Sequence, residues 1–205
     1  DNRSGGAKPL DRLQPAQRLD DRRDAAAAFC ELADTQPLRL KLDGGLRLFA
    51  AIAVDDDTGL AKSALEALAN LVDVDSKPAV EAARVAAAHN ASLFVGADPP
   101  LLPSIVGALE LTDMHLRFHA IQFLHKLLAL EPSRTHEVIL AHPAAVGSVL
   151  TLLDDQREIV RAEAIQLVLQ LARGAPAGLL NLLAFQGAFD RLHSIVASEL
   201  EAAAG

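Results

Sequence analysis

The stretch DDQREIVRAEAIQLVLQLARGAP (residues 154–176) contains every part of the pattern that decides the fold. Two acidic residues open it, an apolar-rich run follows, and a glycine and a proline close it. Within the run, Ala164, Val168 and Leu171 recur at intervals of three or four residues, which places them on one face of an α-helix. Glycine and proline are residues at which helices stop. The stretch therefore predicts an amphipathic helix with a defined start and end.

The same helical pattern occurs three more times toward the N-terminus. Each copy opens with an alanine, and the four leading alanines are separated by 39, 56 and 44 residues. Armadillo and HEAT repeats run at about 40–47 residues, so the first and last spacings fit. The middle spacing is too long, and we assign the surplus to an insertion at residues 73–90 that is partly helical, over residues 78–88. The apolar sets are Ala25-Ala28-Leu32, Ala64-Leu68-Leu71, Ala120-Leu124-Leu127 and Ala164-Val168-Leu171.

Breakers and acids punctuate the chain between these helices. After each long helix comes a breaker, then a second apolar helix, and then acids where the next long helix begins. There a carboxylate can accept backbone N–H bonds and complement the positive end of the helix dipole. Asp155 followed by Glu158 resembles a capping box. The breakers are Pro37, Pro78, Pro132 and Gly174 with Pro176; the second helices are expected at residues 45–54, 103–111 and 144–153; the acids are Asp55, Asp56, Asp57, Asp113, Asp154 and Asp155.

This recurring order predicts an all-α fold, an armadillo-like helical repeat solenoid in which the helices stack into a superhelix. Each repeat of such an array buries its apolar face against its neighbours. We expect residues 1–18 to be a flexible lead-in and residues 19–205 to form about four units of a longer head. A single helical bundle could show the same periodicity and stays an alternative.

Composition limits the classes of protein to consider. Hydrophobic residues make up 51% of the 205 residues, so the chain can bury a core, and the lack of Tyr and Trp leaves the packing mainly to aliphatic side chains. The net charge of −8 argues against a nucleic-acid binder and weakly against direct docking on anionic lipid. A single cysteine suits a reducing compartment, and no signal peptide or membrane span is visible. The start at Asp1 suggests a fragment.

Three stretches carry a resemblance to a known family. Residues 19–25 read LDDRRDA, residues 138–174 contain LLDDQREIVRA, and residues 179–196 read LLNLLAFQGAFDRLHSIV. In this order they resemble the opening, the "LL-D-REVIRN" run and the "I-AFENAFERLLDII" run of the general vesicular transport factors, the long vesicle tethers of endoplasmic-reticulum-to-Golgi traffic. The matched positions include polar and aromatic ones: Arg22, Arg23, Arg157, Arg161, Phe185 and Asp190.

The resemblance implies an armadillo-like head that acts by protein–protein contacts in endoplasmic-reticulum-to-Golgi and intra-Golgi transport. It implies a Rab-type GTPase, SNARE proteins and golgins as partners, and a cytoplasmic protein that reaches Golgi and vesicle membranes indirectly. The family's head is far longer, and its coiled coil and acidic tail have no counterpart here, so a homodimer is expected only through such downstream regions. Ala162 stands where the family has Asn.

The sequence offers no catalytic or cofactor motif, and we expect no enzyme activity, cofactor or metal. The pair Gly44-Gly45 precedes a helix, which can bind an anion, but a simple turn or helix stop is the better interpretation. A zinc site needs three or four ligands, and no His-Glu-x-x-His is present. We interpret the histidines as surface and groove residues: His115, His119, His125, His136 and His142.

The remaining candidates also have a structural interpretation. Cys30 lies within a helix and is expected to be a packed core thiol. Asn90-Ala91-Ser92 matches a glycosylation sequon that a cytosolic protein leaves unused. The four arginines at repeat starts could form a partner-binding stripe, but local salt bridges are favoured: Arg22, Arg23, Arg157 and Arg161, with Asp20, Asp21, Asp24, Asp154 and Asp155. The helically spaced aromatics are expected in the core: Phe118, Phe123, Phe185 and Phe189.

Two other functional classes remain open at this point. A generic armadillo scaffold, such as a nuclear-transport adaptor or a cytoskeletal regulator, would have the same periodicity. Import adaptors of this fold resemble ladders of Trp and Asn, whereas this chain has no Trp and few Asn. An enzyme on a helical scaffold is the weakest alternative. The binding face and its residues are not assigned by the sequence.

Overall fold

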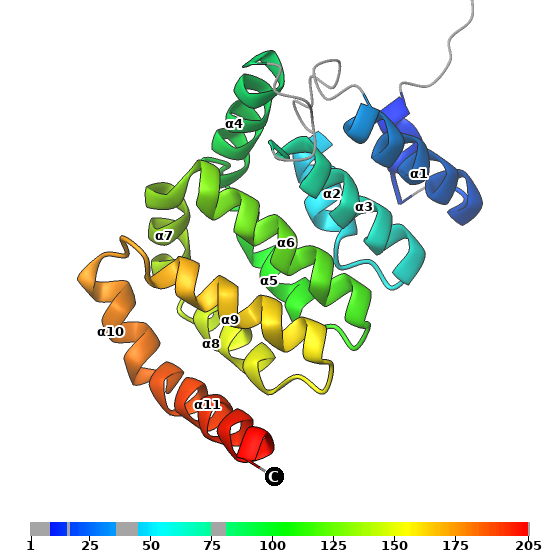
Figure 1. The fold of residues 1–205 in the computed structure, drawn as a ribbon. Helices are drawn as coiled ribbons and strands as arrows, with labels where there is room; N and C mark the ends of the chain where they lie inside the picture. Colours follow the sequence, from blue (N-terminus) through cyan, green and yellow to red (C-terminus); the bar gives the residue numbers. More distant parts are fainter. Residues whose placement is uncertain (1–8, 16, 36–44, 75–80, 205) are drawn as a thin grey trace, which may run out of the picture.

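The computed structural model describes residues 9–15, 17–35, 45–74 and 81–204, and every regular element in these ranges is helical (Figure 1). The elements are the 3-10 helix η1 (Pro9–Leu13), α1 (Leu19–Thr35), α2 (Gly45–Ile52), α3 (Thr58–Leu71), α4 (Glu81–Val95), α5 (Leu102–Leu109), α6 (Met114–Leu130), α7 (Pro132–Ala141), α8 (Ala144–Thr151), the 3-10 helix η3 (Leu152–Asp154), α9 (Glu158–Ala172), α10 (Ala177–Phe185) and α11 (Ala188–Ala204).

The helices stack in three rows, one row for each helix of a repeating unit (Figure 1). The third helices α1, α3, α6 and α9 lie side by side, the second helices α2, α5 and α8 form another row, and the first helices α4, α7 and α10 form the last. One complete unit is therefore α7, α8 and α9. This architecture confirms the predicted all-α armadillo-like solenoid and excludes the single bundle.

The leading alanines mark where the third helices pack. Ala64, Ala120 and Ala164 are fully buried, and Ala25 is nearly so. In α1 the predicted face is wrong, because Ala28 and Leu32 are exposed. The buried residues of α1 are Ala25, Ala26, Phe29 and Ala33. The two positions exposed in α1 correspond to buried ones in α3 and α6, each of which is packed between two third helices, whereas α1 contacts only α3 in that row among the described elements.

Acidic residues were predicted to cap the starts of the third helices α3, α6 and α9, and they do so in α3 and α6. Asp57 Oδ1 accepts the N–H of Leu60 at 2.9 Å and caps α3, and Asp113 Oδ1 accepts the N–H of His115 at 2.8 Å and caps α6. The capping box predicted for α9 is wrong. Asp155 Oδ1 accepts the N–H of Arg157 at 2.8 Å, and α9 begins one residue later without a side-chain cap.

The predicted insertion is an ordinary part of a unit. The helix expected at residues 78–88 is α4, which lies over residues 81–95 in the row of first helices and contacts α7. The extra spacing arises partly because α4 has 15 residues and α7 has 10. The sequon asparagine, Asn90, is buried, and its Nδ2 donates to the carbonyl of Leu71 at 3.0 Å.

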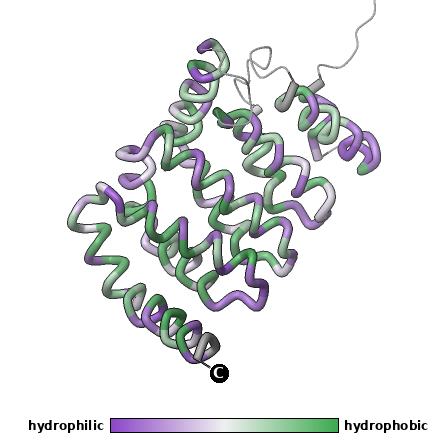
Figure 2. The backbone as a smooth tube through the Cα atoms, in the orientation of Figure 1, coloured by the Kyte–Doolittle hydropathy of each residue, from purple (hydrophilic) through white to green (hydrophobic). Residues whose placement is uncertain are grey.

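Buried apolar residues form one continuous core through all the units, and Figure 2 shows hydrophobic and hydrophilic residues alternating along most helices. Phe94 of α4 and Phe123 of α6 meet edge to face with ring centroids 4.8 Å apart. The core extends into the expected lead-in, because Leu13 of η1 is fully buried. No single described helix is long and apolar enough to cross a membrane; α7 and α8–η3 pass that test only together, with a 103° bend between them.

Candidate functional site

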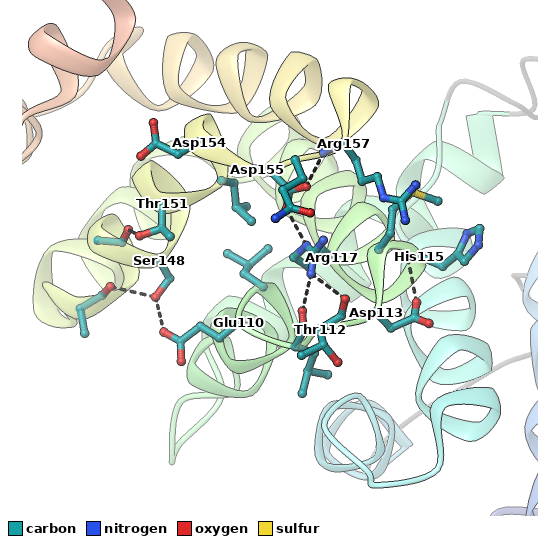
Figure 3. Close-up of a pocket in the computed structure, with 17 residues that line it drawn as sticks. Glu110, Thr112, Asp113, His115, Arg117, Ser148, Thr151, Asp154, Asp155 and Arg157 are labelled. Carbon is teal, nitrogen blue, oxygen red and sulfur yellow. Dashed lines mark hydrogen bonds and ion pairs between the residues drawn. The ribbon is translucent and has the colours of Figure 1, made fainter. Parts of the chain in front are cut away.

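A cleft lies between the third unit (α4–α6) and the fourth unit (α7–α9), with units counted by their third helices. It is at the edge where second helices end and third helices begin, here called the loop edge. Its volume is about 1080 Å³. The walls are the 110–113 loop, α8 and the 154–157 loop, and Figure 3 shows their polar side chains converging on it. The cleft is open to solvent along the loops, which suits contact with a protein surface.

Arg117 forms the floor of this cleft (Figure 3). Its Nη1 donates to the carbonyls of Leu111 at 2.7 Å and Thr112 at 2.9 Å, and its Nε lies 2.9 Å from Oδ2 of Asp155. The side chains are 15% and 9% exposed, so this ion pair is largely shielded from water. It joins α6 to the loop that precedes α9.

The same arrangement joins the first and second units. Arg22 Nη2 lies 2.8 Å from Oδ2 of Asp55, and Arg22 Nε donates to the carbonyl of Leu13 at 3.2 Å. Each arginine stands three residues before a leading alanine, and each aspartate stands nine before the next one. We call this pairing the Arg–Asp clamp. At both seams it is an ion pair between neighbouring units, and at the first seam Arg22 Nη2 also donates a charge-assisted hydrogen bond to Asp55 Oδ2.

On the α8 wall of the cleft, Ser148 is hydrogen-bonded to Glu110 of the facing loop. Ser148 donates to Oε1 of Glu110 at 2.6 Å, and Ser148 is buried. A nucleophilic serine needs a general base that accepts its proton and is itself oriented. The cleft histidine, His115, forms no hydrogen bond to Ser148 within the described residues, and its backbone N–H donates to the capping residue Asp113. The Ser148 hydroxyl is thus engaged with Glu110 in this structure.

A second groove crosses the row of third helices, over α1, α3 and α6. Its volume is about 670 Å³, and small side chains of Ala27, Ser63 and Ala69 line part of it. Glu66 Oε1 lies 3.4 Å from His119 Nε2 across the α3–α6 contact. Burial lowers the pKa of His119 below its usual value, although Glu66 opposes this shift, so the imidazole is mainly neutral at pH 7.

Comparison with known proteins gives the chain's relatives. No family model matches it. It is 27% identical over 198 residues to the bovine (Bos taurus) "General vesicular transport factor p115", covering 94% of this chain and 20% of that protein. It is 31% identical over 99 residues to the Saccharomyces cerevisiae "Intracellular protein transport protein USO1", covering 48% of this chain and 6% of that protein.

The chain is a homologue of the p115/Uso1 vesicular transport factors. The solenoid agrees with this, since a crystal structure of Uso1 superposes with a TM-score of 0.76 at 23% identity, over 93% of this chain and 32% of that one. The chain spans about a fifth of the length of its p115 relatives. By their names, these relatives act in vesicular and intracellular protein transport.

The arginines of this p115/Uso1 homologue make different contacts from those predicted. Within the part of the chain that the structure describes, Arg23 alone has a predicted local partner, Asp20, at 3.7 Å. The shorter contacts cross between units: Arg22 with Asp55, and Arg23 with Asp57, to whose Oδ1 the Arg23 Nε donates at 3.2 Å. The pKa of Asp57 is lowered by this hydrogen bond from Arg23 and by the N–H of Leu60. Alignment of the repeats on their leading alanines would have revealed these partners.

The two arginines near α9 are less constrained. Arg161 Nη1 donates to the backbone carbonyl of Asp155 at 2.8 Å. Arg157 is exposed on the rim of the cleft. Neither forms an ion pair with the predicted Asp154 or Asp155 among the residues described. Asp154 pairs with Arg191 of α11 instead.

The aromatic residues divide into two groups. Phe123 is fully buried as predicted, and Phe118 is half-buried at the groove. The core prediction is wrong for Phe185 and Phe189, which are 90% and 72% exposed. Their helical spacing resembles a core pattern, but they lie on the outward side of α10 and α11.

Histidine and cysteine positions also differ from the expectation. His136 is buried rather than exposed, and burial lowers its pKa. Cys30 is half-buried and lines the groove, with its Sγ 3.7 Å from Glu66 Oε2. Among the described residues no three His, Cys, Asp or Glu come together as a metal-binding group. Gly44 lies outside the described residues, and Gly45 is the first residue of α2.

Proposed function

We propose that this solenoid is part of the head of a vesicle-tethering factor that acts by protein–protein contacts in endoplasmic-reticulum-to-Golgi and intra-Golgi transport. The observation that carries the proposal is the p115 similarity, which runs over 94% of the chain and not over one motif. The partner we propose first is a Rab-type GTPase in its GTP state, with SNARE proteins and golgins as further partners. The site of action is the cytoplasmic surface of Golgi and vesicle membranes.

The architecture suits this role. A solenoid offers an extended surface to a folded partner without a deep pocket. The loop-edge cleft also presents polar side chains that are exposed to solvent. The guanidinium of Arg157 is one of them. Arginine is enriched at protein interfaces because it combines charge with flat apolar surface. We therefore assign partner binding to the loop edge in preference to the row of first helices.

The experiment is retention of this chain, and of the full-length protein, on early-secretory Rab proteins loaded with GTP or GDP. We expect retention that depends on GTP, and about a tenfold loss on Arg157→Glu, as for loss of an interface arginine worth over 1 kcal/mol. Arg84→Glu, at an exposed position on α4, is the matched control and should bind normally. Equal retention on both nucleotides, with no Golgi localisation of the full-length protein, would favour a generic armadillo scaffold.

A further inference from the structure

The seam between the second and third units differs from its two neighbours at the loop edge. The first seam has the clamp Arg22–Asp55, and the third has Arg117–Asp155. In the middle seam, between α3 and α6, the two clamp positions are Ala61 and Leu111. No recorded hydrogen bond or ion pair joins residues 53–62 to residues 107–117, both of which are described throughout. Only apolar contact holds this edge.

The opposite edge of the middle seam, where third helices end, is pinned by polar contacts. Lys126 Nζ of α6 lies 3.3 Å from Oδ2 of Asp73, whose side chain is 8% exposed, and donates to the carbonyl of Ala69 at 3.3 Å. The second helices are tied at the same edge, where Arg47 Nη1 of α2 donates to the carbonyl of Pro99 at 3.2 Å. The middle seam is therefore fixed along one edge only.

One further polar contact crosses the middle seam between its two edges, and it fixes the seam only weakly. Glu66 and His119 meet across the seam at 3.4 Å, but the imidazole is mainly neutral at pH 7 for the reason given above. The rest of the seam is apolar packing, which is non-directional and allows packed helices to slide or rotate slightly. Charge-assisted hydrogen bonds and ion pairs fix orientation, and at this seam those of Lys126 and Arg47 lie at one edge.

We infer that the middle seam is the hinge of this solenoid, where the first two units and the later units open and close at the loop edge about the Lys126–Asp73 contact. The groove over the third helices follows the same motion. Its walls at Ser63 and Glu66 belong to α3, and those at Phe118 and Gln122 belong to α6. Motion about the hinge would therefore change the width of this groove, while the loop-edge cleft at the clamped third seam keeps its shape.

Three equivalent positions make a matched test possible. Asp56, Thr112 and Gln156 each stand eight residues before a leading alanine, and all three are exposed. In a Cys30→Ser background, spin labels at positions 56 and 112 report the middle seam, and labels at 112 and 156 report the third. We expect electron paramagnetic resonance to give a distance distribution about twofold broader for the middle seam, because its edge lacks fixed contacts. Equal widths would overturn the hinge.

A second experiment removes the clamp from the protein that carries the spin labels at positions 112 and 156. Arg117→Ala should broaden the 112–156 distribution toward that of the middle seam. Asp155→Asn, which keeps an oxygen to accept the Arg157 N–H, is the second variant in case Arg117→Ala fails to fold, and circular dichroism checks the helix content of both. A distribution that stays narrow in a folded clamp variant would also overturn the inference, because the clamp would then not be what holds the edge.

Discussion

The first and third seams of the solenoid carry an Arg–Asp clamp at the loop edge, whereas the middle seam is held there by apolar contact alone. All three seams belong to one continuous core. This difference shows that burial and polar contacts contribute in different ways to the structure of a repeat protein. Burial stabilises each seam in proportion to apolar area, and the clamp fixes the register in which the units meet. The predictions below separate the two contributions.

The largest effect is expected in the packing. Phe123 is fully buried and packs on Phe94, so Phe123→Ala leaves a cavity and should lower the free energy of unfolding by about 3–5 kcal/mol. Phe189→Ala is the control, because its side chain is 72% exposed and should change stability by less than about 0.5 kcal/mol. Chemical denaturation of both variants measures this, and similar losses would mean that Phe189 is packed in solution.

Breaking a clamp should cost less than emptying the core. Asp155→Ala leaves Arg117 largely buried without its carboxylate, and we expect a loss of about 2–3 kcal/mol, below the value for a fully buried pair. The adjacent Asp154 pairs with Arg191 at the surface and is 61% exposed, so Asp154→Ala should cost under about 1 kcal/mol. Equal losses for these neighbours would show that the clamp is no stronger than a surface pair.

Protonation of His136 should give a smaller, pH-dependent effect. Burial lowers the pKa of His136 in the folded chain, so the unfolded chain binds the proton more readily. Stability is then complete above the unfolded value of about 6.5 and falls as the pH drops through it, by at most about 1.4 kcal/mol per pH unit. Chemical denaturation at pH 7.5 and at pH 5.5 measures the free energy of unfolding at each pH. The difference between the two values should be smaller for His136→Gln than for the unsubstituted chain. A wild-type-like difference in that variant would assign the dependence to other groups.

Local rules predicted the parts of the fold that depend on nearby residues. The second helices lie within two residues of the expected ends, and Asp57 and Asp113 cap their helices, because periodicity and capping act within one turn. The clamps were missed because Arg22 and Asp55 are 33 residues apart and meet only once the units are in register. Phe185 was misplaced because helical spacing does not tell which face is covered. The sequence assigns no binding residues, since recognition depends on surface that no local pattern marks.

The most direct measurement is a double-mutant cycle on Arg117 and Asp155. If the two side chains clamp the third seam, the losses in unfolding free energy on Arg117→Ala and Asp155→Ala should be strongly non-additive, with a coupling of about 1–2 kcal/mol. The same cycle between Arg117 and Asp154, which pairs with Arg191 instead, should be additive to within about 0.5 kcal/mol. A coupling below about 0.5 kcal/mol for Arg117 with Asp155 would contradict the clamp, and with it the contrast between the seams.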